Sequence, residues 1–313
     1  MMSLILGAGF SKWAAGLPLA SELFDFAITA HTQRDARRLQ RVVRLKTAWD
    51  EANPDGLSEQ FVAGALRSSG RNRRLVSWYV TRRLLDPFIR TVLGGTQALM
   101  IDDSRRLQHE GIRIAEHFLR QFEERRLCGI VTTNYDLLVE YALGTGGFNY
   151  GALDEELKGR GKNPWFPWQG IPIKLTGSLR VAKIHGSVSW DENNRYTDGR
   201  CGVKGTALIV PPDSERRAPQ RLRLTWDLAR SILKDSTDLL VFGFAFNPYD
   251  EAALNLLATA GRKVRSVFLI DPDPKIGPAQ RVWPGASIQP CGPPPEDNAG
   301  LRAWVRDFGP FEL

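Results

Sequence analysis

The chain has 313 residues, 42% of them hydrophobic and 25% charged, which is enough to bury the core of one large α/β domain or of two linked modules. No run of about 18 uncharged apolar residues occurs, so we expect no membrane-spanning helix. The N-terminal residues carry no basic segment of the kind that opens a secretory signal, and we expect the protein to stay in the cytoplasm.

Cysteine and histidine usage argues against a metal. The three cysteines, Cys128, Cys201 and Cys291, are odd in number and far apart, so they form neither a disulfide framework nor a paired metal motif. The four histidines form no HExxH or His-x-His pair. We therefore expect a reducing compartment and neither a structural nor a catalytic metal.

The formal charge of +7 is concentrated in one segment. Residues 31–126 hold 19 lysines and arginines against 12 aspartates and glutamates, which accounts for the whole excess. Such asymmetry is typical either of a solvated helical face or of a surface for an acidic or nucleic-acid partner.

The expected elements start with an apolar strand at 4–6, which Gly7 ends. A helix should follow from Leu17-Pro18 to about Phe26, because proline suits a first helical turn. Apolar residues at helical spacing then predict helices over 33–49, 57–67, 71–85 and 104–125, with a restart at 86–87. We interpret residues 31–126 as an all-helical insertion.

After the insertion, short apolar segments alternate with helical ones, which is typical of a mostly parallel sheet. Strands are expected at 128–132, 181–184, 207–210, 239–243 and 267–270, and helices at 136–143, 222–233, 250–260 and 299–308. The stretch 144–176, rich in glycine, proline and tryptophan, is expected to form a loop over a site. The predicted fold is α/β, with a Rossmann-like, mostly parallel sheet that has helices on both faces. It comprises residues 1–30 and 127–313, interrupted by the inserted all-helical module.

A glycine turn, Gly7-Ala8-Gly9, directly follows the first strand, and Phe10 and Ser11 come after it. Without side chains, the backbone N–H groups of such a turn can approach a pyrophosphate, and a following helix N-terminus adds a favourable dipole. The third glycine of GxGxxG is missing, and a Gly-x-Gly after a strand is often only a tight turn. The position after the first strand favours a phosphate site.

Polar residues also follow two later strands. Asn134 and Asp136 lie at the carboxyl end of the strand at 128–132, where open α/β sheets place ligand groups, although Asn134 could instead cap the next helix. His185 follows the strand at 181–184, and the glycine after it gives access, although a lone histidine is usually structural.

Two further segments lie at the ends of late strands. The strand at 239–243 ends at Gly243, and Phe244 and Ala245 follow it. Asp271 follows the strand at 267–270. An acidic residue in the latter position can accept hydrogen bonds from a ribose, but it can equally start a turn before proline.

Taken in this order, the segments resemble the sirtuin-like family, particularly its bacterial NAD-hydrolysing branch. The resemblance rests on GAGFS (7–11) with Gly16-Leu17-Pro18 after it, TTNYD (132–136), KIHGSVSW (183–190), ALIVPP (207–212), VFGFAF (241–246) with Asp250 nearby, and LIDPDP (269–274). It covers residues 3–30 and 127–290 and leaves the insertion unmatched.

The resemblance implies that NAD is the substrate and that Asn134 and His185 are catalytic. Asn134 and Asp136 would lie by the nicotinamide and its ribose, and His185 would be the base that touches ribose hydroxyls. The resemblance implies three further groups of NAD contacts. The near phosphates would be bound by Gly7, Ala8, Gly9, Phe10 and Ser11, and the far phosphate and ribose by Gly243, Phe244 and Ala245. Asp271 would contact the adenosine end.

Departures from the deacylating sirtuins point away from peptide substrates. Those enzymes carry two CxxC zinc pairs after the catalytic histidine, where this chain has Cys201 alone, and a phenylalanine-arginine loop where this chain has Lys12-Trp13-Ala14-Ala15. The resemblance therefore implies an NAD+ glycohydrolase, the effector of a bacterial anti-phage system. It would act as a homo-oligomer or beside a companion ATPase or Argonaute-type protein. An NAD-dependent protein deacylase and a non-catalytic module that senses NAD or ADP-ribose stay open as alternatives.

The helix expected at 33–49 carries a basic stripe at helical spacing, made of Arg34, Arg37, Arg38, Arg41 and Arg44. A solvated helix face is the commoner explanation, and a contact with nucleic acid or with an acidic partner subunit is the alternative. Aromatic residues do not interleave with the stripe, which argues against single-strand binding.

Overall fold

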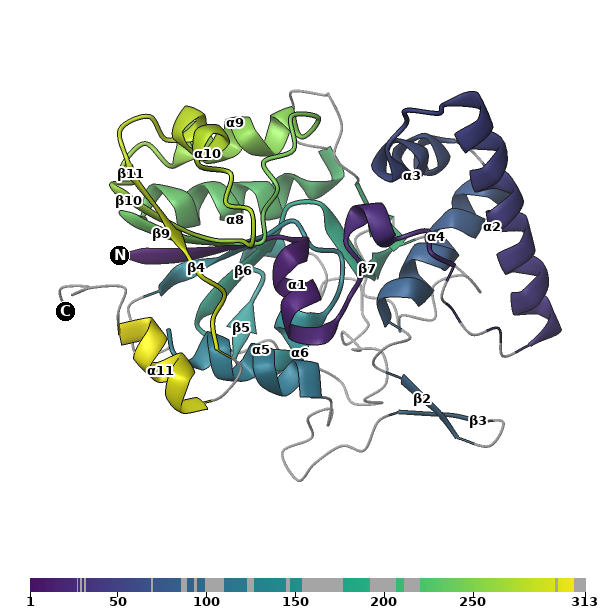
Figure 1. The fold of residues 1–313 in the computed structure, drawn as a ribbon, viewed down its shortest axis with the longest axis horizontal. Coiled ribbons are helices and arrows are strands. Elements are labelled where there is room, and N and C mark those ends of the chain that lie inside the picture. Colours follow the sequence, from purple (N-terminus) through teal and green to yellow (C-terminus); the bar gives the residue numbers. More distant parts are fainter. Residues whose placement is uncertain are drawn as a thin grey trace.

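Seven strands form the central sheet of the computed structural model, which describes residues 1–26, 28, 30, 32–68, 70–85, 89–92, 95–98, 110–122, 127–144, 147–153, 177–191, 207–210, 220–295 and 298–306. Their order is β11-β10-β9-β1-β4-β6-β5, and neighbouring strands are parallel (Figure 1). The strands are β1 (Met2–Leu6), β4 (Leu127–Thr132), β5 (Phe148–Asn149), β6 (Leu179–Lys183), β9 (Asp238–Phe242), β10 (Ser266–Ile270) and β11 (Ser287–Cys291). The predicted parallel sheet is confirmed.

Helices cover both faces of this sheet (Figure 1). One face carries α8 (Arg223–Lys234), α9 (Glu251–Ala260) and α10 (Ile276–Val282), and the other carries α1 (Ala8–Ala15), α5 (Glu110–Arg120), α6 (Leu138–Leu143) and α11 (Asn298–Arg306). None of the helices in the described ranges is both long enough and apolar enough to cross a bilayer. The predicted Rossmann-like arrangement of helices on both faces is confirmed.

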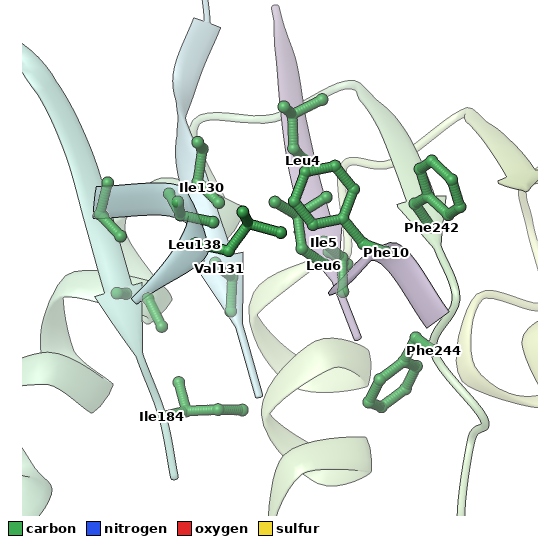
Figure 2. Packing of buried hydrophobic residues seen from close by; sticks show 14 of the residues in the cluster. Leu4, Ile5, Leu6, Phe10, Ile130, Val131, Leu138, Ile184, Phe242 and Phe244 are labelled. Carbon is green, nitrogen blue, oxygen red and sulfur yellow. The ribbon is translucent and has the colours of Figure 1, made fainter. Parts of the chain in front are cut away.

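Burial on both faces explains why the central strands are apolar along their whole length. All five residues of β1 are buried, and Leu4, Ile5 and Leu6 pack between the two helical layers (Figure 2). Phe10 of α1 lies over the sheet, with its ring 5.4 Å from that of Phe242. A parallel sheet between two helical layers requires continuous apolar segments, so apolar and polar residues do not alternate along these strands.

The strand order reverses beside β1. From β1 the chain builds outward through β4 and β6 on one side, and it later returns to add β9, β10 and β11 on the other side. Open α/β sheets bind ligands in the crevice at the carboxyl ends of the strands where the order reverses. The loops that begin at Gly7 and Gly243 leave the sheet at this point.

The insertion departs from the all-helical prediction. It contains α2 (Gln33–Ala52), α3 (Ser58–Arg67) and α4 (Arg71–Leu85) as expected, but it also contains two strands, β2 (Ile89–Val92) and β3 (Gly95–Ala98), which pair antiparallel. The restart expected at 86–87 lies outside the described residues. Helix α5 packs against α1 and α6 and so belongs to the helical layer of the main sheet.

Helix α4 joins the insertion to the rest of the protein. The Tyr79 hydroxyl donates to the carbonyl oxygen of Leu23 at 2.9 Å and accepts from the Phe26 N–H at 3.2 Å. The Ser77 hydroxyl oxygen accepts from the Ala207 N–H at 3.0 Å. Strand β8 (Ala207–Ile209) pairs antiparallel with β7 (Gly186–Asp191) in a small separate sheet, so the expected strand at 207–210 forms but does not join the main sheet.

The prediction of a helix from Leu17-Pro18 to Phe26 is wrong. Helix α1 begins earlier, at Ala8, and ends at Ala15, and the left-handed φ of 65° at Gly16 closes it. The segment that follows is extended at Leu19 and contains a single 3-10 turn, η1 (Ala20–Glu22). The Glu22 carboxylate accepts from the Leu19 N–H and pairs with Lys12, which holds this turn against α1.

The basic stripe of α2 is present but narrower than predicted. Arg34, Arg37, Arg41 and Arg44 are exposed along one face. Arg38 is largely buried, with 19% of its side chain exposed, and its guanidinium lies 5.4 Å from the ring centre of Trp78 on α4. It therefore helps to pack the insertion together.

Candidate functional site

The glycine turn and the loop after β9 touch each other through their backbones. A Cβ atom on Gly7 would lie 2.3 Å from the carbonyl oxygen of Gly243, and one on Gly9 would lie 2.5 Å from the Gly243 Cα. Gly243 itself has a φ of 59°, in the left-handed region that favours glycine. All three glycines are therefore required by close packing at the strand-order reversal.

This packing also occupies part of the phosphate-binding backbone that the sequence predicted. The Gly7 N–H donates to the Phe242 carbonyl oxygen at 2.9 Å, and the Gly9 N–H donates to the Gly243 carbonyl oxygen at 3.1 Å. The Ala8 N–H, at the first position of α1, bonds to no other described residue. The donor left for an anion is thus Ala8, supported by the positive end of the helix dipole.

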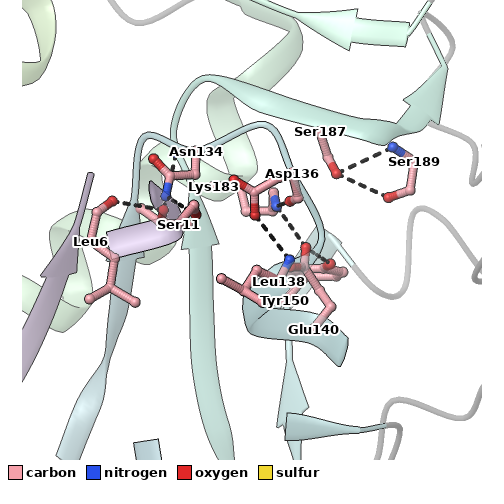
Figure 3. Close-up of polar contacts among 11 residues, drawn as sticks. Leu6, Ser11, Asn134, Asp136, Leu138, Glu140, Tyr150, Lys183, Ser187 and Ser189 are labelled. Atoms are coloured by element: carbon pink, nitrogen blue, oxygen red, sulfur yellow. Dashed lines mark hydrogen bonds and ion pairs between the residues drawn. The ribbon is translucent and has the colours of Figure 1, made fainter. Parts of the chain in front are cut away.

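Asn134 is fixed against the glycine turn. Its Nδ2 atom donates to the Gly7 carbonyl oxygen at 2.9 Å. The same atom donates to the Ser11 hydroxyl, also at 2.9 Å (Figure 3). Its own N–H donates to the hydroxyl of Thr132, the last residue of β4, at 3.1 Å. The residue is 7% exposed, and the two hydrogen bonds of Nδ2 hold the amide in one orientation. It does not cap the following helix, which was the alternative considered from the sequence.

Asp136 belongs to a buried polar network below the same loop. Its Oδ1 atom accepts from the Leu138 N–H at 2.9 Å and so starts α6. Its backbone carbonyl accepts from the ammonium of Lys183, which also pairs with Glu140 at 2.8 Å (Figure 3). The Tyr150 hydroxyl donates to the same Glu140 oxygen at 2.8 Å. This network could not be predicted from the sequence, because its members come from three separate segments.

His185 lies at the carboxyl end of β6 and faces Asp250. The distance from His185 Nε2 to Asp250 Oδ2 is 3.0 Å, and both side chains are 5% exposed. The ring of Tyr135 is centred 6.2 Å from the imidazole. Burial and the Asp250 carboxylate raise the pKa of Tyr135 well above its ordinary value of 10, so this hydroxyl stays protonated.

A single cavity brings these groups together. Nine of the residues expected at the site line it, namely Gly7, Ala8, Ser11, Asn134, Asp136, His185, Gly243, Phe244 and Ala245. Gly9 and Phe10 pack beneath the turn, and the Asp271 carboxylate accepts from the Asp273 N–H in a turn; these three do not line the cavity.

The opposite wall of the cavity comes from residues that sequence reasoning missed. Pro18, Leu19, Ala20 and Leu23 surround η1, and the insertion adds Glu59 and Val62 from α3 and Leu84 from α4. Tyr135, Asn247 and Asp250 complete the lining near His185. Asp250 lies close to the segment VFGFAF (241–246) in the sequence, but no sequence pattern links it to His185, which is 65 positions away.

No group of three or more histidine, cysteine or acidic side chains in the described ranges is arranged to hold a metal ion. The cavity lining includes the N-terminus of α1, which is the positive end of the helix dipole, and the carboxylates of Asp250 and Glu59. Both carboxylates act on the Tyr135 hydroxyl.

A family model described as a SIR2-like domain matches residues 129–291, which is more than half of the chain. The chain belongs to the SIR2-like family. The family expected from the sequence segments is therefore confirmed, and the matched residues of this SIR2-like chain include Asn134, His185, Gly243 and Asp250.

Several solved structures are similar to the SIR2-like chain. One, described as the structural basis for the mechanism and regulation of Sir2 enzymes, is 13% identical over 98% of this chain and 91% of that chain, with a TM-score of 0.44. A Sir2 homologue in complex with NAD is 14% identical over 98% and 88% of the two chains, with a TM-score of 0.42. An ADP-ribose complex of a Sir2 homologue mutant is 13% identical over 100% and 94%, with a TM-score of 0.44. Similarity at this level carries no inference about activity. A comparison with curated proteins finds no match.

Proposed function

We propose that this SIR2-like protein is an NAD+ glycohydrolase, which cleaves NAD+ to nicotinamide and ADP-ribose. The observation that carries the proposal is the single cavity in which a helix N-terminus, the amide of Asn134 and the imidazole of His185 meet. These are the groups that an anionic dinucleotide with a scissile N-glycosyl bond would use.

The residues present fit such a substrate. Ala8 offers a free N–H at the positive end of α1, and Gly7 and Gly243 have no side chains that would keep a pyrophosphate away. Glu59 adds a carboxylate to the lining, near enough to act on the Tyr135 hydroxyl, and a carboxylate favours the cationic nicotinamide ring over a pyrophosphate. NAD+ with its pyrophosphate at Ala8 and its nicotinamide ring towards Glu59 would match these charges.

Cleavage of the bond between nicotinamide and ribose requires little acid catalysis from the protein. When the bond between the ribose C1′ and the nicotinamide nitrogen breaks, its electron pair neutralises the pyridinium, so the leaving group needs no proton. The oxygen of a water forms the new bond to C1′, and the proton it loses passes through a protein base to solvent. Positioned dipoles stabilise the oxocarbenium charge in a shielded pocket.

Each polar residue then has a defined task. Asn134, held by two hydrogen bonds, presents its amide oxygen to the attacking water or to a ribose hydroxyl. His185 accepts a hydroxyl or water proton, an effect typically worth about 10²–10⁴-fold in rate. A second opposed carboxylate of the glycosidase kind is not required, because nicotinamide is cationic in NAD+ and leaves as a neutral molecule without taking up a proton.

Water is favoured over an acyl-lysine peptide as the second substrate. The whole chain has three cysteines, so it cannot form the two CxxC zinc pairs of the deacylating sirtuins. The anti-phage role, a homo-oligomeric state and a companion ATPase or Argonaute-type subunit are proposals that rest on the resemblance to the bacterial NAD-hydrolysing branch.

The test is release of nicotinamide and ADP-ribose from NAD+, followed by chromatography. Asn134→Ala and His185→Ala should each lower the rate by about 100-fold or more. Matched controls are Asn255→Ala on the exposed face of α9 and His117→Ala on α5, neither of which lines the cavity; both should keep the wild-type rate.

Wild-type rates in Asn134→Ala or His185→Ala would overturn the assignment of these residues. Tight NAD+ binding by calorimetry without any turnover, alone or with companion proteins, would overturn the enzyme and support a non-catalytic sensing module. Formation of acetyl-ADP-ribose from an acetyl-lysine peptide would support the deacylase instead.

A further inference from the structure

Asp250 begins α9 but does not form the side-chain hydrogen bond that is usual for an aspartate at the start of a helix. It is the N-cap residue of α9, where a carboxylate usually accepts a hydrogen bond from the backbone of the first helical turn. Here the side chain makes no such cap bond, and the residue contributes only its backbone, whose carbonyl oxygen accepts from the Leu254 N–H at 3.0 Å. The carboxylate is directed away from the helix that it begins.

The carboxylate is directed to the imidazole of His185. The two side chains meet at 3.0 Å through Oδ2 and Nε2, and only 5% of each is exposed. No other described residue bonds to the imidazole, and the Tyr135 ring lies to one side of it. A buried carboxylate that gives up a local cap bond must be compensated by its partner and by the positive end of the α9 dipole.

This contact fixes which nitrogen of His185 carries the proton. A neutral imidazole that donates Nε2–H to Asp250 leaves Nδ1 as an unprotonated acceptor. A free imidazole would instead exchange between two tautomers and two ring orientations, and only part of that population could accept a proton from a substrate hydroxyl.

We propose that Asp250 is the positioning residue of this site, which orients His185 and holds Nδ1 ready to accept a proton. The inference rests on the proposed NAD+ hydrolysis for its kinetic consequence, but not for the pairing itself. An orienting carboxylate also stabilises the imidazolium that forms when Nδ1 takes the proton, so its effect should lie mainly in kcat.

The main test is Asp250→Ser, because serine is a good N-cap residue but too short to reach the imidazole. We expect the variant to remain folded by circular dichroism at the assay temperature, kcat to fall about 10–100-fold, and KM for NAD+ to change by less than about threefold. In a His185→Gln background, Asp250→Ser should lower the remaining rate no further, because the two residues act as one unit. Wild-type kcat in Asp250→Ser, or full additivity with His185→Gln, would overturn the proposal.

A second measurement does not depend on turnover. Nitrogen-15 chemical shifts of the His185 imidazole, assigned with His185→Gln, should report a protonated Nε2 and an unprotonated Nδ1 in the wild type, and a mixture of tautomers in Asp250→Ser. A protonated Nδ1 in the wild type would overturn the pairing. A wild type that binds NAD+ without cleaving it, yet shows the Nε2 tautomer, would overturn the proposed function and support the pairing.

Discussion

The buried ion pair between Lys183 and Glu140 offers a quantitative test of how the site loop is held. The ammonium and the carboxylate are 2.8 Å apart, with side chains 1% and 0% exposed, and Lys183 also donates to the backbone carbonyl of Asp136. Replacing Lys183 by methionine keeps much of its volume but leaves Glu140 with the Tyr150 hydroxyl as its donor. Breaking a buried pair by removing one partner typically costs about 3–5 kcal/mol.

We therefore expect Lys183→Met to lower the free energy of unfolding by about 3–5 kcal/mol, a large share of the stability of a typical domain. The assay is urea unfolding followed by circular dichroism. The double variant Lys183→Met, Glu140→Gln removes the unpaired charge and keeps an acceptor for Tyr150, so it should recover about 1–3 kcal/mol. Lys234→Met, on the exposed face of α8, is the matched control and should change stability by less than about 0.5 kcal/mol.

A loss below about 1 kcal/mol for Lys183→Met would refute this reasoning, because the carboxylate would then be solvated or paired in another way. A double variant less stable than Lys183→Met would show that the charge of Glu140 is not the source of the loss. Either result would also remove the argument that this pair holds the loop carrying Asn134.

Three further outcomes follow from other contacts. Gly9→Ala should cost about 1–3 kcal/mol in urea unfolding because its Cβ would lie 2.5 Å from the Gly243 Cα, whereas Gly285→Ala, with nothing within 4 Å, should be nearly neutral; equal effects would contradict the close packing. Glu59→Gln should raise KM for NAD+ about two- to fivefold with little change in kcat, and an unchanged KM would separate this carboxylate from the nicotinamide ring. Burial raises the pKa of Tyr79 from 10 to about 12, so the stability that its neutral hydroxyl contributes is full below pH 10 and is lost as the pH rises towards 12. The advantage of wild type over Tyr79→Phe in urea should therefore shrink between pH 8 and pH 11, and a constant difference would contradict it.

The sequence was most informative where local pattern and parallel-sheet geometry coincide. Apolar segments ending in Gly7, Asn134, His185 and Gly243 could be placed together because the carboxyl ends of parallel strands meet at one edge of the sheet. The helices of the insertion from 33 to 85 were also predicted within a few residues, since their apolar spacing is regular.

Elements without such a pattern were missed for identifiable reasons. Strand β11 is an edge strand with Pro290 and mostly exposed side chains, so it carries no continuous apolar signal. Helix α10 contains Gly277 and Pro278, both poor helix formers, although proline is tolerated in a first turn. The start of α1 at Ala8 was missed because its first turn is set by contact with Gly243.

The rest of the site depends on tertiary contacts that no short segment encodes. Asp250 at the start of α9 could have been taken for an ordinary cap, and the structure alone pairs it with His185. The same holds for Glu59 and Val62, which reach the cavity because α3 packs over η1.

The insertion supplies both one wall of the cavity and the exposed arginines of α2. Helix α3, which lines the cavity, and helix α2, which exposes the arginines Arg34, Arg37, Arg41 and Arg44, both pack on α4. An anion or acidic protein that binds those arginines and shifts the three helices therefore also changes the affinity of the cavity for its substrate. By thermodynamic reciprocity, the substrate would then change the affinity of that partner by the same factor.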